Sequence, residues 1–329
     1  MKLAIFNARP YDEAFFINCN NKIGLDLHFF EARMSLETYK LAEGFSAICV
    51  FVNDILDADV LQGLNEVGTK FIALRCAGYN NVDLTHAKKL GIRVARVPAY
   101  SPESVAEYTI GLMLTLNRKI HRAYNRVKEN NFALDGFMGV DFHNRTVGVV
   151  GTGRIGFAVI RILHGMGCTI LAYDIQPNPD CLALGVEYAE LPALFKASDV
   201  ITLHCPHTDE NHHMINADSL KLMKDGVMII NTSRGGLIDT NAVVEGLKTR
   251  KVSNLGLDVY EYERPLLYQD HSNEVLLDDM FSRLLTFPNV IITGHQGFFT
   301  HDALESIAHM TLENVHSFYA GAPSQNELF

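Results

Sequence analysis

The chain has 329 residues, of which 48% are hydrophobic, and it carries a formal net charge of −10. This length can form one large or two medium domains, each with its own core. The acidic balance and the lack of any Lys or Arg run argue against a nucleic-acid partner. No apolar stretch approaches the roughly 20 residues of a membrane-spanning helix, so we expect no membrane association.

The six cysteines are scattered and form no Cys-x-x-Cys pair. Several lie in apolar runs, where buried free thiols are expected, and this pattern is typical of a reducing cytosol. The apolar run at residues 3–6 is too short for a signal peptide. We therefore expect a cytoplasmic protein.

Four apolar runs in the first hundred residues predict buried parallel strands, at residues 3–6, 47–52, 71–74 and 94–97. The loop at 75–83 follows the third run. Loops at the carboxyl ends of such strands bind ligands in open α/β sheets. A plain turn in which Asp83 caps the next helix fits the same residues equally well, so both interpretations stay open.

Two prolines, Pro98 and Pro102, hold the segment 97–102 extended and predict a hinge. Ser101 as N-cap and Pro102 at the first helical position predict the start of one long helix through 103–126. The apolar stripe of this helix fits core packing, and it also fits a subunit interface.

An apolar strand at 147–150 breaks into a Gly-x-Gly-x-x-Gly motif formed by Gly151, Gly153 and Gly156. The first glycine permits a sharp turn, the second permits close approach of a pyrophosphate, and the third permits tight helix packing. The next strand, 169–173, ends at Asp174, 23 residues after Gly151. This order of strand, turn, helix, strand and acid predicts a dinucleotide site.

Asp174 also indicates which dinucleotide binds. A carboxylate can accept both ribose hydroxyls of NAD, whereas it repels the 2′-phosphate of NADP by about 4 kcal/mol at about 4 Å and an effective dielectric of about 20. Residues 175–178 contain no Arg or Lys that would reverse this preference. The sequence therefore predicts NAD.

Strands and helices keep alternating after Asp174. We expect strands at 200–203, 227–230, 255–257 and 290–293, helices at 191–196, 217–224 and 239–249, and an acidic insert at 260–279 made of a loop and a short helix. This alternation predicts a parallel sheet wound on both sides.

Three of these strands are followed by groups that suit one reaction. Arg234 follows the strand at 227–230, Glu261 and Glu263 follow 255–257, and His295 follows 290–293. The strand ends share one edge, so we expect these groups to converge there. Arg can hold a carboxylate with two hydrogen bonds, His can donate a proton to an alkoxide, and an acid can orient the imidazole. This chemistry suits hydride reduction of a 2-oxo acid.

Each residue has an ordinary alternative: a surface ion pair for the Arg, solvation of a loop for the acids, and a structural role for the His. A local cluster contains His204, His207, His212 and His213, but no acid or Cys stands at a matching spacing, so we expect no metal.

Four ordered motifs resemble the D-isomer-specific 2-hydroxyacid dehydrogenase family over essentially the whole chain: 151–156, 231–235, 257–263 and 294–296. The resemblance implies an α/β fold of two Rossmann-like or flavodoxin-like doubly wound parallel-sheet domains. A discontinuous substrate domain would comprise 1–100 plus 297–329, and the NAD-binding domain would comprise 101–296. The C-terminal helix would pack on the first hundred residues, and closure about the hinges would exclude water.

The resemblance also implies residue roles. Arg234 would anchor the substrate, Glu263 would partner His295, and His295 would act as acid and base. The NAD contacts would be Arg154, Ile155, Asp174, Cys205, Pro206, Asn211, Thr232, Ser233, Arg234 and Asp258, in addition to the three glycines. The substrate would also meet Cys76, Ala77, Gly78, Tyr100 and Phe298.

Many family members have Pro directly before the catalytic His, where this chain has Gly294. This departure resembles the lactate branch and implies reversible reduction of pyruvate to D-lactate with NADH. The helix from Glu103 resembles the dimerisation arm and implies a homodimer or homotetramer. Two rivals are a sibling enzyme for glycerate, hydroxypyruvate or a bulkier 2-oxo acid, and a redox-sensing NAD-binding regulator, against which the acidic charge counts.

Overall fold

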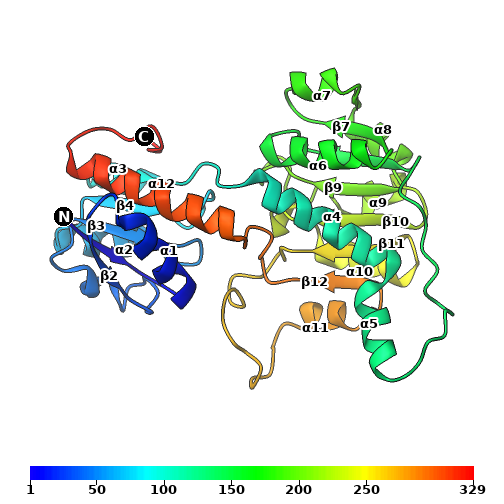
Figure 1. Ribbon diagram of the computed structural model, residues 1–329, viewed down its shortest axis with the longest axis horizontal. Helices are drawn as coiled ribbons and strands as arrows, with labels where there is room; N and C mark the ends of the chain where they lie inside the picture. The colour runs from blue at the N-terminus through cyan, green and yellow to red at the C-terminus, as the bar shows by residue number, and fades with distance from the viewer. The chain divides into compact units, whose positions relative to one another are not determined.

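The computed structural model describes every residue from Met1 to Phe329, and the chain forms two compact units (Figure 1). Unit 1 comprises Met1–Ser101 and Phe299–Phe329, and unit 2 comprises Pro102–Phe298. The chain therefore leaves unit 1 once and returns to it near the C-terminus. None of the helices combines the length and apolar character needed to cross a membrane.

Unit 1 contains a five-stranded parallel sheet in the order β2-β1-β3-β4-β5, which is the flavodoxin-like arrangement. The strands are β1 (Lys2–Ile5), β2 (Asp26–Phe29), β3 (Ala47–Val50), β4 (Phe71–Leu74) and β5 (Arg93–Ala95). The helices are α1 (Pro10–Asn20), α2 (Ala58–Glu66), α3 (Leu84–Lys89) and α12 (His301–Tyr319), with a short 3₁₀ turn, η1 (Tyr39–Ala42). Strands β3 and β4 are buried along their whole length, as their apolar runs predict.

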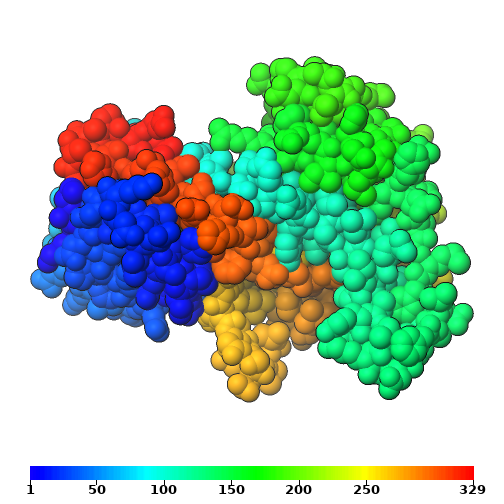
Figure 2. Space-filling view, in the orientation of Figure 1, coloured from blue at the N-terminus to red at the C-terminus, as the bar shows by residue number.

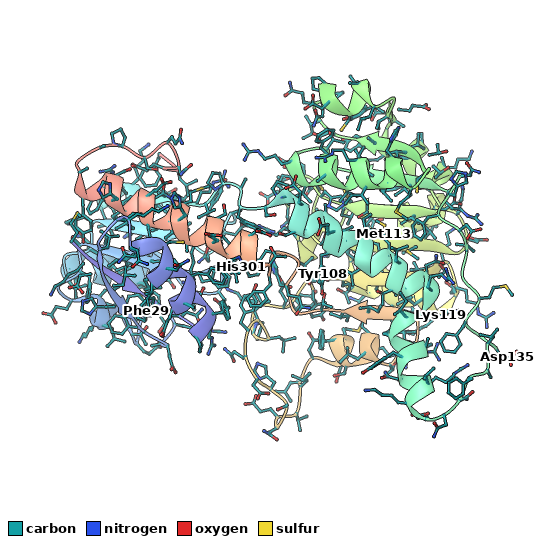
Figure 3. The ribbon with its side chains drawn as sticks, viewed as in Figure 1. Phe29, Tyr108, Met113, Lys119, Asp135 and His301 are labelled. Carbon is teal, nitrogen blue, oxygen red and sulfur yellow. The ribbon has the colours of Figure 1, made fainter.

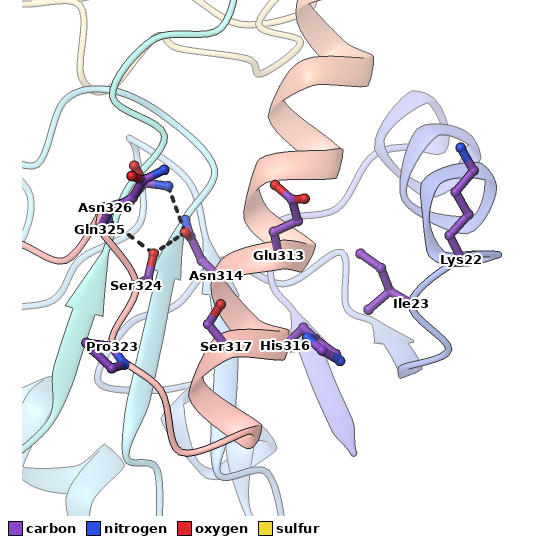
Figure 4. Close-up of a pocket in the computed structure, with 10 residues that line it drawn as sticks. All are labelled: Lys22, Ile23, Glu313, Asn314, His316, Ser317, Pro323, Ser324, Gln325 and Asn326. Carbon is purple, nitrogen blue, oxygen red and sulfur yellow. Dashed lines mark hydrogen bonds between the residues drawn. The ribbon is translucent and has the colours of Figure 1, made fainter.

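The C-terminal segment completes unit 1. As predicted, α12 packs on residues of the first hundred, against α1 and β4. The tail then returns to β5, where Glu327 accepts two hydrogen bonds from Arg93, at 3.0 and 2.5 Å. Asn314 of α12 holds the tail through Ser324 and Asn326 beside a polar pocket of about 540 Å³ (Figure 4). None of the predicted site residues lines this pocket.

Unit 2 contains a seven-stranded parallel sheet in the order β12-β11-β10-β9-β6-β7-β8. The strands are β6 (Thr146–Val150), β7 (Thr169–Tyr173), β8 (Glu187–Tyr188), β9 (Val200–Leu203), β10 (Val227–Asn231), β11 (Val252–Leu257) and β12 (Val290–Ile292). The order reverses between β6 and β9, which is the topological switch point of a Rossmann sheet. The predicted doubly wound fold is confirmed.

Helices cover both faces of this sheet (Figure 1). They are α4 (Pro102–Arg118), α5 (Ile120–Lys128), α6 (Arg154–Gly165), α7 (Pro179–Ala183), α8 (Leu191–Ala197), α9 (Ala217–Leu222), α10 (Thr240–Lys248) and α11 (Asp279–Leu285), with the 3₁₀ turn η2 (Gly235–Leu237). Neighbouring β6 residues point to opposite cores, because Val149 packs in the cluster with α4 and α6, and Val150 in the cluster with α8, α9 and α10. A strand that is buried on both faces reads as a continuous apolar run.

The prediction of a single helix over 103–126 is wrong. It breaks at Lys119, which has a left-handed φ of 51°, into α4 and α5. The Lys119 ammonium donates to the carbonyls of Gly136 and Met138, and Asn117 bonds both backbone groups of Val140. These bonds hold the returning loop against the junction of the two helices, which Figure 3 marks at Lys119.

The insert at 260–279 forms a long loop, and its expected short helix, α11, begins only at the last residue of the insert, Asp279. Asp278 caps this helix by accepting a hydrogen bond from the Phe281 amide. Most of the insert is therefore a loop that continues from the end of β11, and this loop carries the predicted acids Glu261 and Glu263.

Candidate functional site

One row of paired residues crosses the sheet of unit 2 at its carboxyl edge. Val150 pairs with Tyr173 and Leu203, Asn231 pairs with Leu203 and Leu257, and Leu257 pairs with Ile292. The six strands therefore end level with one another. The loops that carry Gly151, Asp174, Cys205, Arg234, Glu263 and His295 all leave this edge, as predicted.

The glycine turn after β6 leaves no room for a side chain at two of its three glycines, Gly151 and Gly156. Gly151 has φ of +94°, and a Cβ there would lie 2.5 Å from the Cys205 amide nitrogen. A Cβ on Gly156 would overlap the Gly151 carbonyl oxygen. At Gly153, which precedes α6, a Cβ would meet nothing within 4 Å. The turn thus brings a helix N-terminus to the edge with an unobstructed approach, which fits a pyrophosphate.

Asp174 lies directly after β7 and bonds back to this turn. One carboxylate oxygen accepts hydrogen bonds from the Thr152 amide at 2.6 Å and the Thr152 hydroxyl at 3.1 Å. The other accepts a longer bond from the Gln176 amide at 3.3 Å. A carboxylate accepts through about four lone-pair sites, so the residue retains capacity for ribose hydroxyls.

The loop after β9 lies against the glycine turn. Burial raises the pKa of Cys205 to about 11, so its thiol is protonated at neutral pH. Asn211 donates to the Pro206 carbonyl at 2.7 Å and accepts from the Thr208 amide at 2.8 Å. The Asn211 side chain therefore fixes the shape of its own loop.

The loop after β10 carries Arg234, and the buried side chain of Asn231 fixes the shape of this loop. The Asn231 amide group donates to the Arg234 carbonyl at 2.8 Å, and its oxygen accepts from the Ser233 amide at 3.0 Å. Ser233 in turn donates to the Cys205 carbonyl at 2.6 Å. The hydroxyls of Thr232 and Thr109 of α4 lie 2.8 Å apart. These bonds join the Arg234 loop to the β9 loop and to α4.

His295 and Glu263 meet at the ends of β12 and β11. The Nδ1 atom of His295 lies 2.9 Å from Oε1 of Glu263, while the second oxygen of Glu263 accepts from the Tyr260 amide at 2.9 Å. The two side chains remain 21% and 20% exposed, so solvent and small molecules can reach them. Because Nδ1 of His295 faces Glu263, Nε2 on the other side of the ring remains for other partners.

Asp258 has a role that the sequence did not reveal. It is 2% exposed, and its carboxylate accepts hydrogen bonds from the Thr293 hydroxyl and from the Gln296 and Gly297 amides. Its carbonyl accepts from the His295 amide at 2.7 Å. Asp258 therefore anchors the His295 loop. The signal available in the sequence was an acid placed directly after a buried strand.

Glu261 forms a separate structural pairing. Its carboxylate lies 2.6 Å from Nε2 of His213 and accepts from the Thr240 hydroxyl at 2.7 Å. His212 stacks on His213 and lies 3.0 Å from His207. The chain contains no group of three or more His, Cys, Asp or Glu residues arranged to hold a metal ion.

The other predicted substrate residues lie in two places. Cys76, Ala77 and Gly78 follow β4, whereas Tyr100 and Phe298 lie next to the points where the chain passes from one unit to the other. The Cys76 thiol donates to the Gly78 carbonyl at 3.2 Å, and the Ala77 carbonyl accepts from Arg96 at 2.8 Å. In the same loop Asp83 caps α3, as one of the two open interpretations expected. Tyr100 is half-buried in unit 1, and Phe298 is buried at the end of unit 2.

A doubly wound parallel sheet with this glycine turn, a following acid, and an imidazole–carboxylate pair at the same edge defines a dinucleotide-dependent oxidoreductase class. Comparison with known proteins gives the family. The model of the D-isomer specific 2-hydroxyacid dehydrogenase NAD-binding domain matches residues 110–297. The D-lactate dehydrogenase of Escherichia coli strain K12 is 51% identical over 100% of both chains.

Solved structures agree over the full length. The apo-structure of D-lactate dehydrogenase from Escherichia coli matches with a TM-score of 0.91, covering 100% of both chains at 50% identity. The pyruvate reductase of Chlamydomonas reinhardtii matches with a TM-score of 0.94 at 41% identity, covering 99% of this chain and 98% of that one. The chain belongs to the D-isomer-specific 2-hydroxyacid dehydrogenase family and is an NAD-dependent oxidoreductase.

Proposed function

We propose that this protein reduces pyruvate to D-lactate with NADH, reversibly, and that His295, Glu263 and Arg234 carry the reaction. The observation that supports this most is the 2.9 Å pairing of His295 with Glu263 on the sheet edge that also carries the glycine turn and Arg234. The D-lactate dehydrogenase and pyruvate reductase relatives support the choice of substrate.

In this mechanism the chain binds, orients and protonates the substrate. Arg234 holds the carboxylate of pyruvate with its planar guanidinium. When bound, NADH would supply the hydride for the C2 carbonyl carbon. His295 gives the proton on Nε2 to the alkoxide oxygen, while Glu263 holds the Nδ1 side of the ring. Pyruvate, NADH and one proton thus become D-lactate and NAD⁺.

We assign the remaining contacts to the same scheme. Unit 2 would hold NAD through Gly151, Gly153, Arg154, Ile155, Gly156, Asp174, Cys205, Pro206, Asn211, Thr232, Ser233 and Arg234. Cys76, Ala77, Gly78, Tyr100 and Phe298 would contact the substrate. The engaged carboxylate of Asp258 favours a supporting role for this residue over a direct one.

The decisive experiment mixes the protein, NADH and pyruvate and follows the absorbance of the reduced nicotinamide. We expect oxidation of NADH and a kcat/KM for pyruvate above those for hydroxypyruvate and phenylpyruvate. A higher kcat/KM for either of the other acids would assign the protein to a sibling activity. Binding of NADH without turnover of any 2-oxo acid would favour the alternative function, a redox-sensing NAD-binding regulator.

The residues at 120–141, named the α5 arm, support a self-association proposal. None of the α5 residues is buried. Phe132, Leu134 and Met138 in the following loop are 71%, 85% and 90% exposed. These exposed apolar side chains lie on the segment that continues the helix from Glu103, which resembles the family's dimerisation arm, and we assign them to an interface with a second copy of this chain. Figure 2 shows the arm as a lobe of unit 2, and Figure 3 places Asp135 at its outer edge.

A further inference from the structure

Two bulky residues with left-handed backbones meet beside the catalytic imidazole. His295 has φ of 53° and Tyr268 has φ of 57°. Left-handed φ values are uncommon outside glycine, and they are strained for a residue as bulky as Tyr. The Tyr268 hydroxyl donates to the His295 carbonyl at 2.9 Å. Such strain persists only where surrounding contacts determine the backbone, and it clusters at functional sites.

The contacts around His295 fix both of its backbone dihedrals. Its amide donates to the Asp258 carbonyl at 2.7 Å, which fixes the preceding peptide. The following peptide is bonded at both ends, because its carbonyl accepts from Tyr268 and its Gln296 amide donates to the Asp258 carboxylate at 2.9 Å. Removing the Tyr268 hydroxyl would leave this peptide anchored on one side only.

Both Glu263 and Tyr268 lie in the insert, which follows the end of β11 (Figure 1), and Tyr268 directly follows a turn that begins at Glu263. The amides of Leu266 and Leu267 both donate to the Glu263 carbonyl, at 2.8 and 3.0 Å, and Leu267 is buried. The Glu263 side chain reaches the imidazole from one end of the turn, and the Tyr268 side chain reaches the His295 carbonyl from the other. The turn thus contacts His295 at both its ring and its backbone.

We propose that Tyr268 is a positioning residue for the reaction, acting through the His295 backbone to hold the imidazole in the orientation needed for proton transfer. Proton transfer requires hydrogen-bond geometry, and a displacement of about 1 Å can cost about 100-fold in rate. The inference rests on His295 being the proton donor of the proposed function. It extends that function from the acid–base pair to the insert that carries Glu263.

The test is Tyr268→Phe in the full-length protein, assayed with NADH and NADH deuterated at the transferred position. A hydrogen bond contributes about 0.5–1.5 kcal/mol net, so we expect kcat to fall about 2-fold to 13-fold. We expect the KM for the 2-oxo acid to change less than about 2-fold and the isotope effect on kcat to stay or increase, because the chemical step is slowed.

Tyr262→Phe is the matched control, since Tyr262 is a 52% exposed residue of the same insert and its hydroxyl bonds Glu261, which does not contact His295. We expect its kcat to equal that of the parent protein. A Tyr268→Phe kcat within about 1.5-fold of the parent, or a loss shared by the Tyr262 variant, would overturn the proposal. So would a fall in rate accounted for entirely by a smaller folded fraction, measured by active-site titration with NADH.

The parent protein separates this inference from the choice of substrate. If the parent reduces hydroxypyruvate or phenylpyruvate rather than pyruvate, the proposed substrate is wrong and Tyr268→Phe is tested on the acid that turns over. If His295→Gln retains near-normal turnover of every acid, His295 is not the donor and the positioning role fails with it.

Discussion

Glu263 and Glu261 lie two residues apart, yet their carboxylates hold different partners. Glu263 orients His295, whereas Glu261 joins His213 to Thr240. We expect Glu263→Gln to lower kcat by roughly 10-fold to 100-fold while the Kd for NADH stays unchanged, because the variant loses the carboxylate beside the proposed proton donor, His295. Glu261→Gln is the control, and its effect should fall on thermal stability. Equal loss of kcat in both variants would contradict this assignment.

Asp174 combines a charge with a local structural bond. Its carboxylate accepts from the Thr152 amide at 2.6 Å, so Asp174→Asn keeps an acceptor for the glycine turn while removing the charge. We expect the preference for NADH over NADPH, measured as the ratio of kcat/KM values, to narrow by about 10-fold or more, because repulsion of a 2′-phosphate is lost. An unaltered ratio would exclude Asp174 as the discriminating residue.

His204 gives the fold a dependence on acid. Burial lowers its pKa to about 3, and its Nε2 lies 2.9 Å from the Thr202 hydroxyl. The unfolded chain takes up this proton near pH 6.5, so the stabilisation present above that pH is lost as pH falls toward 3. Urea unfolding measures the free energy of unfolding at each pH. Between pH 7 and pH 5 we expect this free energy to fall by about 1–2 kcal/mol less in His204→Gln than in the parent protein. Parallel plots of unfolding free energy against pH for the two proteins would contradict this role of His204.

At the scale of elements, burial decided which strands could be predicted. Strands β3, β4 and β10 are buried throughout, and their sequences are continuous apolar runs apart from Asn231 at the end of β10. The edge strands β2 and β8 carry polar residues and few strand partners, so their sequences give little signal. The break at Lys119 was also invisible, because neither Gly nor Pro marks it and the bonds that stabilise it come from a loop about 20 residues further on.

Asn117 makes this break testable. Its buried side chain accepts from the Val140 amide at 2.9 Å and donates to the Val140 carbonyl at 2.7 Å. In Asn117→Ala we expect faster amide hydrogen exchange across 129–141 and a loss of about 1–3 kcal/mol in unfolding free energy, because buried backbone groups lose their partner. Exchange that stays slow in this loop would mean that other contacts hold it.

At the scale of the whole molecule, the sequence located groups that follow strands directly, and it failed where a loop path decides the contact. Gly151, Asp174, Arg234 and His295 were predictable because parallel strands share a carboxyl edge. The bond from Tyr268 to the His295 carbonyl depends on how a loop of about 20 residues folds, and no periodic pattern encodes that path. Asp258 directly follows β11, but its anchoring role depends on how the loop after β12 returns to its carboxylate.

The α5 arm supports the last prediction. A net charge of −10 opposes association at long range, so a second copy must be held by apolar contact over a limited area. Leu134 and Met138 are 85% and 90% exposed in the arm, and Val275 and Leu277 are 85% and 91% exposed in the insert. We expect Leu134→Asp with Met138→Asp to lower the oligomeric state in sedimentation velocity, since charges would be buried unpaired.

The matched pair Val275→Asp with Leu277→Asp introduces the same charge at equal exposure, so it should leave sedimentation unchanged. Dissociation of both double variants would indicate a general effect of added negative charge on an acidic chain. Dissociation of the insert variant alone would indicate that the interface lies in the insert and not in the α5 arm. Only loss confined to the arm variant fits an interface built from residues 120–141, because that outcome depends on where the apolar surface lies and not on how much charge is added.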